Sequence, residues 1–257
     1  MSLIADNGCV QINGAELSTL GVYLAPDGIQ IGEAELLTAF AEVPARWGAH
    51  DLSATDTGGR VVSGRREIVL SVAATVQHGT SAAQANTDIS TAKRTIGALH
   101  GTECTVTDVR PGLTWSGRMS VGQWADVYDA AGILTHAACA LTLLAQPCAK
   151  ASAKTVTLTN GGSVSYGGNV ETWPTITVTP AAAGAVSVTI RSTVWSFTAS
   201  STAKVYVECG RAWAHLSDNS AIIPNLSADW PSLVPGANAI ALSNCTASMT
   251  YDELVMV

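Results

Sequence analysis

The sequence is poor in charge, and its positive charge is not clustered. Only 13% of the 257 residues are Asp, Glu, Lys or Arg, and 13 basic against 20 acidic residues give a formal net charge of −7. No run of basic residues is longer than the pair Arg65-Arg66. Because a surface of this sign repels the phosphate backbone, the composition argues against a nucleic-acid-binding protein.

Long apolar runs and closely spaced cysteines are also missing. No stretch reaches the ~18 uninterrupted apolar residues of a membrane-spanning helix. Met1 to Asp6 carry no basic segment followed by an apolar run, so we expect neither a membrane span nor a secretory signal. No Cys-x-x-Cys pair occurs, which favours free thiols over a zinc site, and a reducing cytoplasm disfavours a disulfide. The six cysteines are Cys9, Cys104, Cys139, Cys148, Cys209 and Cys245.

Known catalytic motifs are absent as well. The sequence contains no phosphate loop, no dinucleotide fingerprint and no nucleophile with family-like local sequence. His50-Asp51 is the nearest approach to a general base, but adjacent residues rarely present their side chains in a usable geometry. We therefore predict that the protein is not an enzyme and has no catalytic residue, metal ligand or cofactor. The alternative is a hydrolase that uses two scattered carboxylates.

The residues that are abundant, Ala, Val, Thr, Ser and Gly, suit β-sheets, and strand-like periodicity dominates. The exception begins at Ser81, which has capping-box spacing to Gln84. An apolar stripe at helical spacing follows, formed by Ala85, Ile89, Ala92, Ile96 and Leu99. We predict a helix over residues 82–99 that ends before Gly101 and lies on a sheet.

Strands and turns surround this helix in the first half of the chain. Ile68, Leu70, Val72, Ala74 and Val76 recur at every second position, with Glu67, Ser71 and Thr75 on the other face, which predicts a strand over residues 66–76. Asn13-Gly14 predicts a hairpin turn, and Pro26-Asp27-Gly28 predicts a second turn. Residues 113–128 and 133–145 predict a long hairpin, in which we interpret Trp115 and Trp124 as packing residues.

The periodicity is lost over residues 146–153, where we place a domain boundary. This gives a first domain, 1–148, and a second domain, 149–257. Short strands follow the boundary, predicted at 155–159, 175–179, 186–191, 195–199, 204–208, 211–216, 239–242 and 247–251. Their spacing indicates a β-sandwich or jelly-roll-like module. Cys209-Gly210 predicts a two-residue hairpin turn, and Pro235-Gly236 a type II turn.

Four stretches carry a resemblance to a known family. Asn169 to Val178 contains a Pro-x-Ile-x-Val run, and Leu233 to Ile240 reads Leu-x-Pro-Gly-x-Asn-x-Ile. In this order they resemble the C-terminal module of the distal tail proteins of siphophages. Ile12 to Val22 is similar to the opening segment of that family, and Arg65 to Ile68 to its next block.

The resemblance implies a mainly β fold with one helix in its N-terminal half. A ring-forming belt domain (1–148), a β-sandwich or split barrel, would precede a galectin-like β-sandwich (149–257). Six copies would form a hub at the distal end of a long non-contractile tail, joining the tail tube to the tip or receptor-binding apparatus. The implied partners are the tail tube, tape measure and tail-tip proteins, with DNA passing through the lumen without specific binding and with no membrane contact.

The implied location is the virion, after assembly in the host cytoplasm. The sequence lacks the His-x-Asn-Pro-Arg and Trp-x-x-Glu-x-Arg runs of sugar-binding galectins, so the resemblance does not extend to lectin activity. An alternative function is a carbohydrate-binding module without catalysis, which the seven tryptophans and the sandwich-like second half suggest.

Overall fold

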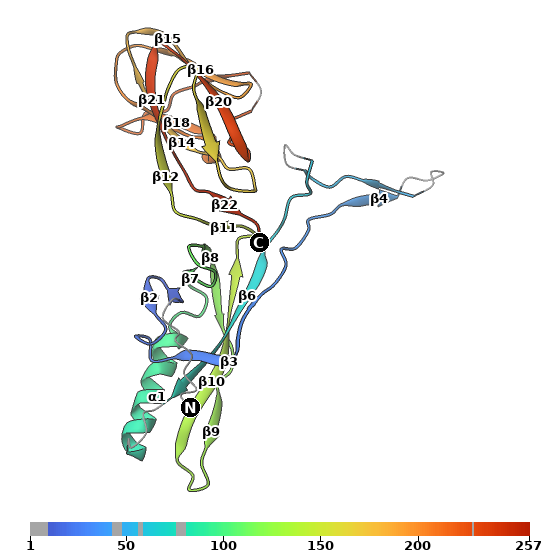
Figure 1. Ribbon diagram of the computed structural model, residues 1–257, viewed down its shortest axis with the longest axis vertical. Helices are drawn as coiled ribbons and strands as arrows, with labels where there is room; N and C mark the ends of the chain where they lie inside the picture. The colour runs from blue at the N-terminus through green and yellow to red at the C-terminus, as the bar shows by residue number, and fades with distance from the viewer. Residues whose placement is uncertain (1–9, 43–47, 56–58, 76–80, 228) are drawn as a thin grey trace. The chain divides into compact units, whose positions relative to one another are not determined.

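The computed structural model describes the chain except for residues 1–9, 43–47, 56–58, 76–80 and 228 (Figure 1). The chain divides into two compact units, Met1–Ala149 and Lys150–Val257. Each unit has its own cluster of buried apolar side chains. One of the six cysteines, Cys9, one of the seven tryptophans, Trp47, and one of the five histidines, His78, lie outside the described residues.

An antiparallel sheet forms the body of the N-terminal unit, with the strand order β2-β1-β7-β8-β10-β6-β3 and with β9 paired to β10. The strands are β1 (Gln11–Ile12), β2 (Ala15–Glu16), β3 (Tyr23–Ile31), β6 (Arg66–Thr75), β7 (Glu103–Thr107), β8 (Thr114–Val121), β9 (Ala125–Tyr128) and β10 (Leu134–Ala145). In β6, Ile68, Leu70 and Val72 are all fully buried, as the alternation predicted. Trp115 is fully buried and Trp124 packs against the core, so both are packing residues as predicted.

Helix α1 (Ala82–Gly97) covers the core of this unit with Ile89, Ala92 and Ile96, and Ala85 is buried on the same face of the helix. Ser81 caps it by accepting a hydrogen bond from the Gln84 amide, whereas the Gln84 side chain donates to Asp88 instead of returning to the cap. The predicted end at residue 99 is wrong. The backbone N–H of Gly101 donates to the carbonyl of Met119 in β8 at 2.8 Å. This hydrogen bond directs the chain away from the helix axis.

Two predicted turns also differ from the structure. Residues 26–28 remain inside β3, where the pairing with β6 shifts register between Leu24 and Ile29. Gly28, at φ +62°, is absorbed as a β-bulge because β6 continues beside it. In the other unit, the predicted two-residue turn at Cys209-Gly210 is a 3-10 turn, η1 (Cys209–Arg211), and Ala212 rather than Gly210 takes the positive φ.

The C-terminal unit is a sandwich of two five-stranded antiparallel sheets, ordered β12-β21-β14-β17-β18 and β13-β20-β15-β16-β19, around one core. The strands are β12 (Lys154–Leu158), β13 (Ser163–Tyr166), β14 (Thr175–Pro180), β15 (Gly184–Ile190), β16 (Thr193–Ala199), β17 (Val205–Glu208), β18 (Trp213–Leu216), β19 (Asn225–Leu226), β20 (Gly236–Ser243) and β21 (Cys245–Tyr251). The short strands β11 (Ala149–Lys150) and β22 (Leu254–Val255) pair with one another and with neither sheet of the sandwich. The sequence analysis missed β13, although Ser163 to Tyr166 alternate between polar and apolar residues, and β19, whose two residues are too few to show a period.

A buried asparagine explains the Pro-Gly-x-Asn pattern. Asn238 is fully buried, and its Nδ2 donates to the carbonyls of Val234 and Gly236 at 2.8 and 3.0 Å. Its Oδ1 accepts from the Val234 amide at 3.0 Å. Gly236 has a φ of +94°, as the second central position of a type II turn requires. The side chain therefore stabilises the turn that starts β20.

We expect Ile89→Asp to destabilise the N-terminal unit by about 3–5 kcal/mol, because it places an unpaired charge among buried apolar groups. Ser90→Asp adds the same charge on the exposed side of the same helix and should cost little. Thermal denaturation of both variants measures the difference. Equal melting temperatures would show that the stripe is not buried.

We expect Gly236→Ala to cost about 1–2 kcal/mol through backbone strain alone, because an added Cβ would meet no atom within 4 Å. Gly210→Ala is the matched control, since its φ is not positive and the added Cβ would make an ordinary 3.5 Å contact. Chemical denaturation of the two variants tests this pair. A loss at Gly210 as large as that at Gly236 would contradict the assignment.

Candidate interaction surfaces

The described residues contain no group of three or more His, Cys, Asp or Glu side chains that could hold a metal ion. Their histidines lie apart: His100 accepts a hydrogen bond from the Val121 amide, and His136 contacts Thr135. His50 and Asp51 follow one another in β5 (Ala49–Asp51), so their side chains point to opposite faces. Asp51 instead accepts from the Ser53 amide at 2.9 Å, and hydrogen bonding by the side chain of Ser53, followed by its amide, lowers the pKa of Asp51.

The five described cysteines, Cys104, Cys139, Cys148, Cys209 and Cys245, are free thiols. Burial raises the pKa of Cys139 to about 11 and that of Cys209 to about 12. Burial also raises the pKa values of Cys148 and Cys245. These four cysteines are therefore protonated at neutral pH. The protonated thiol is much less reactive than the thiolate. No helix in the described part of the chain is long and apolar enough to cross a bilayer.

A two-stranded ribbon, which we call the arm, leaves the N-terminal sheet between β3 and β6. The arm comprises residues 32–42, 48–55 and 59–64 and contains β4 (Phe40–Glu42) paired with β5 (Figure 1). Backbone hydrogen bonds such as Leu37 N–H to the Val62 carbonyl at 3.0 Å join its two sides. Neither β4 nor β5 pairs with the larger sheet.

Large apolar side chains of the arm are exposed to solvent. They are Leu36, Leu37, Phe40, Leu52 and Val62, and Phe40 exposes 63% of its surface. An isolated two-stranded ribbon is at best marginally stable in water. The arm therefore has the character of a segment that packs against another surface.

The β9–β10 hairpin provides a second exposed apolar surface in the same unit. All four residues of β9 are exposed, and Val127, Tyr128 and Ile133 present large apolar side chains around its tip. Asp129 shapes the turn, because its carboxylate accepts from the amides of Ala131 and Ile133 at 2.8 Å.

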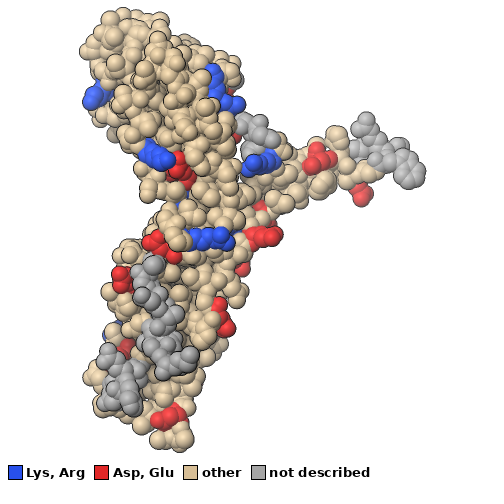
Figure 2. Space-filling model, in the orientation of Figure 1, with Lys and Arg blue, Asp and Glu red and all other residues tan. Residues whose placement is uncertain are grey.

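Over the described atoms of the face in Figure 2, charged residues are scattered and form no continuous basic patch.

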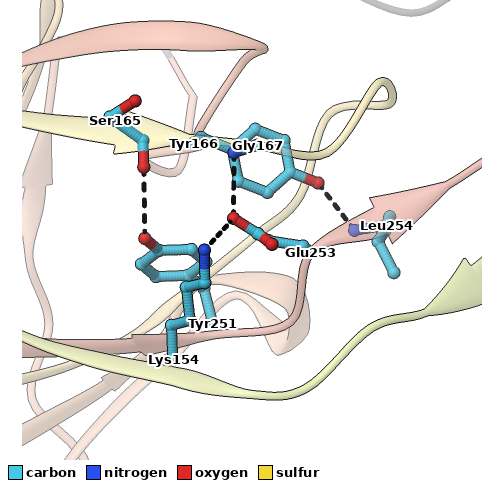
Figure 3. A network of polar contacts seen from close by, with 7 residues as sticks. All are labelled: Lys154, Ser165, Tyr166, Gly167, Tyr251, Glu253 and Leu254. Carbon is cyan, nitrogen blue, oxygen red and sulfur yellow. Dashed lines mark hydrogen bonds and ion pairs between the residues drawn. The ribbon is translucent and has the colours of Figure 1, made fainter. Parts of the chain in front are cut away.

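A polar network in the C-terminal unit joins segments that are far apart in sequence (Figure 3). Glu253 Oε1 accepts from Lys154 Nζ at 2.6 Å and from the Gly167 amide at 3.0 Å. The Tyr166 hydroxyl accepts from the Leu254 amide at 2.9 Å. The network thus fixes the final strand, β22, to β12 and to the end of β13.

The residues that follow Tyr166, Gly167-Gly168-Asn169, are suited to this network. A Cβ on Gly167 would lie 2.7 Å from Glu253 Oε1, and one on Gly168 would lie 2.2 Å from the Tyr166 hydroxyl oxygen. Asn169 forms two hydrogen bonds with the backbone of Met256, at 2.7 and 2.8 Å. The network is therefore a closure of the sandwich, and we interpret it as structural.

An aromatic row lies on β17 and β18, on the outer side of one sheet of the sandwich. The rings of Trp213 and His215 stack at 4.1 Å between centroids, and those of His215 and Tyr206 at 5.5 Å. Glu208 lies opposite Trp213 in the strand register. The sequence analysis did not find this cluster, because the residues come together only through the register of the two strands.

The hydrogen bond from Lys154 holds the pKa of Glu253 below its ordinary value, with a further contribution from the Gly167 amide. Its stabilising effect is therefore present at neutral pH and is lost as the pH falls below the ordinary carboxylate range. We expect Glu253→Gln to lower the melting temperature of the C-terminal unit at pH 7 and to flatten its dependence between about pH 5 and 3. A variant with an unchanged acid profile, measured by scanning calorimetry, would contradict this.

Comparisons with known proteins bear on both units. Residues 167–254 match the family model of the siphovirus-type tail component, C-terminal domain. No curated protein sequence matches the chain. Among solved structures, the fold is similar to that of the Dit protein (gp 19.1) of phage SPP1, described as a paradigm of the hub adsorption apparatus in phages that infect Gram-positive bacteria. That match has a TM-score of 0.68 and 15% identity, and covers 96% of this chain and 98% of the other.

Chains of the phage p2 baseplate in its activated conformation, with Sr and with Ca, match at TM-scores of 0.34 and 0.33. Their identities are 8% and 9%, and each match covers 94% of this chain and 97% of the other. Similarity at this level carries no argument. The family model, which covers most of the sandwich, and the fold shared over nearly the whole chain agree with the resemblance in the sequence. Residues 167–254 are thus similar to the siphovirus-type tail component, C-terminal domain, and the fold of nearly the whole chain is similar to that of SPP1 Dit.

Proposed function

We propose that this protein is a structural component of a long non-contractile phage tail, where it forms the ring-shaped hub at the distal end. The hub would join the tail tube to the tip or receptor-binding apparatus. The observation that carries the proposal is the fold shared with SPP1 Dit over 96% of the chain, together with the family match in residues 167–254. No catalytic step is part of the proposal, because the matched family is one of tail components.

A ring of identical subunits requires heterologous contacts, in which one surface of a subunit meets a different surface of the next. The N-terminal unit offers two unlike apolar surfaces, the arm and the tip of the β9–β10 hairpin. We assign the arm to the neighbouring subunit, because its exposed leucines and phenylalanine have no core of their own to enter. Burial of such side chains is the main driving force of stable association.

The remaining features of the proposal follow from a hub position. Six copies surround a lumen through which DNA passes without specific binding, and the net charge of −7 is compatible with a wall that does not hold DNA. The tail tube, tape measure and tail-tip proteins are the proposed neighbours. The protein would be made and assembled in the host cytoplasm and end in the virion.

We expect the double variant Phe40→Ser, Leu52→Ser to remain folded but to lose the ring, because both side chains are at least 60% exposed in the isolated chain. Light scattering then gives the protomer mass where the unaltered protein gives an oligomer. Ile223→Ser is the matched control, since Ile223 is 91% exposed and lies in the other unit. Intact rings in the double variant, with the melting temperature preserved, would remove the arm from the interface.

A further inference from the structure

The outer face of the sheet β12-β21-β14-β17-β18 is polar and nearly continuous in hydroxyl groups. Its strands place Thr155, Thr250 and Thr175 in one cross-strand row, and Thr157, Ser248 and Thr177 in the next. The alternate residues of these strands point into the core. Five strands at a spacing of about 4.8 Å make this face about 19 Å wide.

The rows of hydroxyls end at the aromatic row. In register, Thr177 lies opposite Tyr206, and Tyr206 opposite His215. The ring planes of His215 are within 22° and 23° of those of Trp213 and Tyr206, so the three rings hold one another in place. Trp213 stands at the end of the row and is half-buried, so part of its ring reaches solvent. Within this stack of three rings, Trp213 stacks on His215 alone. Rings fixed in this way lose little conformational entropy when a ligand binds.

Groups that can recognise hydroxyls stand beside Trp213. Glu208 Oε2 accepts from Arg211 Nη1 at 3.2 Å, and Glu208 Oε1 lies 3.7 Å from His215 Nε2. The Arg211 side chain is 76% exposed, so most of its donors face water. Trp173 is 48% exposed and lies beside Gly210, where an added Cβ would be 3.5 Å from the Trp173 Cβ.

We propose that this end of the sheet, formed by Trp173, Tyr206, Glu208, Arg211, Trp213 and His215, binds a neutral polysaccharide. The apolar face of a sugar ring stacks on the part of the half-buried Trp213 ring that reaches solvent, while Glu208 accepts from sugar hydroxyls and Arg211 donates to them. The carboxylate and the guanidinium balance one another in charge, which favours an uncharged ligand over an anionic polymer. The adjoining hydroxyl face would accommodate further sugar residues of the chain.

A protein partner fits this surface less well, because the centre of a protein interface is normally apolar and loses its water. Here only the aromatic end is apolar, and the rest of the face is formed by Thr and Ser. The site does not depend on the hub assignment, since all of its residues lie in the C-terminal unit. A failure of one proposal therefore leaves the other in place.

The test is an array of neutral oligosaccharides of glucose, galactose, mannose and rhamnose, probed with the full-length protein. We expect binding to at least one neutral series and a loss of at least tenfold in Trp213→Ala, Glu208→Gln and Arg211→Ala. Ile223→Ala, which truncates a side chain that is 91% exposed and lies outside this group of residues, should bind as the unaltered protein does.

The melting temperature of each variant shows whether a loss of binding comes from the loss of the site or from unfolding of the protein. If Trp213→Ala does not fold, Glu208→Gln and Arg211→Ala carry the test, because their side chains reach solvent. A blank array with the folded protein would overturn the proposal. Glycan binding that all three variants retain would overturn it as well.

Discussion

The structure depends on the burial of one face of each strand, which the alternation of apolar and polar residues imposes. In β6, every second residue from Arg66 to Ala74 is buried, and β10 pairs with that strand over its whole length. Helix α1 closes the core with small or branched apolar side chains. Since each unit of the chain completes its own core in this way, the outer strand faces and the arm are free to carry contacts with other molecules.

The arm is the part of the N-terminal unit whose apolar side chains are not buried in a core. Its two sides are hydrogen-bonded to one another, yet its leucines and Phe40 remain in solvent. A sequence keeps such side chains at a cost in solubility unless they are covered in the assembled state. The same chain therefore combines a self-sufficient sheet with a ribbon whose apolar surface is exposed, and this division fits the proposed role as a ring subunit.

Local patterns predicted most of the fold. The stripe from Ala85 to Ile96 and the apolar residues at every second position from Ile68 specify their elements through short-range periodicity, and Asn13-Gly14 forms its hairpin as predicted. The errors occurred where tertiary contacts overrule local preference: β6 holds residues 26–28 in a bulged strand, and β8 draws Gly101 away from the helix. Sites were harder to predict, because the Glu253 network and the row of Tyr206, His215 and Trp213 depend on strand register. No sequence spacing encodes those contacts.

The most direct test of the hub assignment is the mass of the full-length protein in solution, measured by light scattering over a concentration series with negative-stain images of the same samples. The account predicts closed rings with six times the 26.4 kDa mass of the protomer. A monomer at every concentration, with no ring in the images, would contradict it.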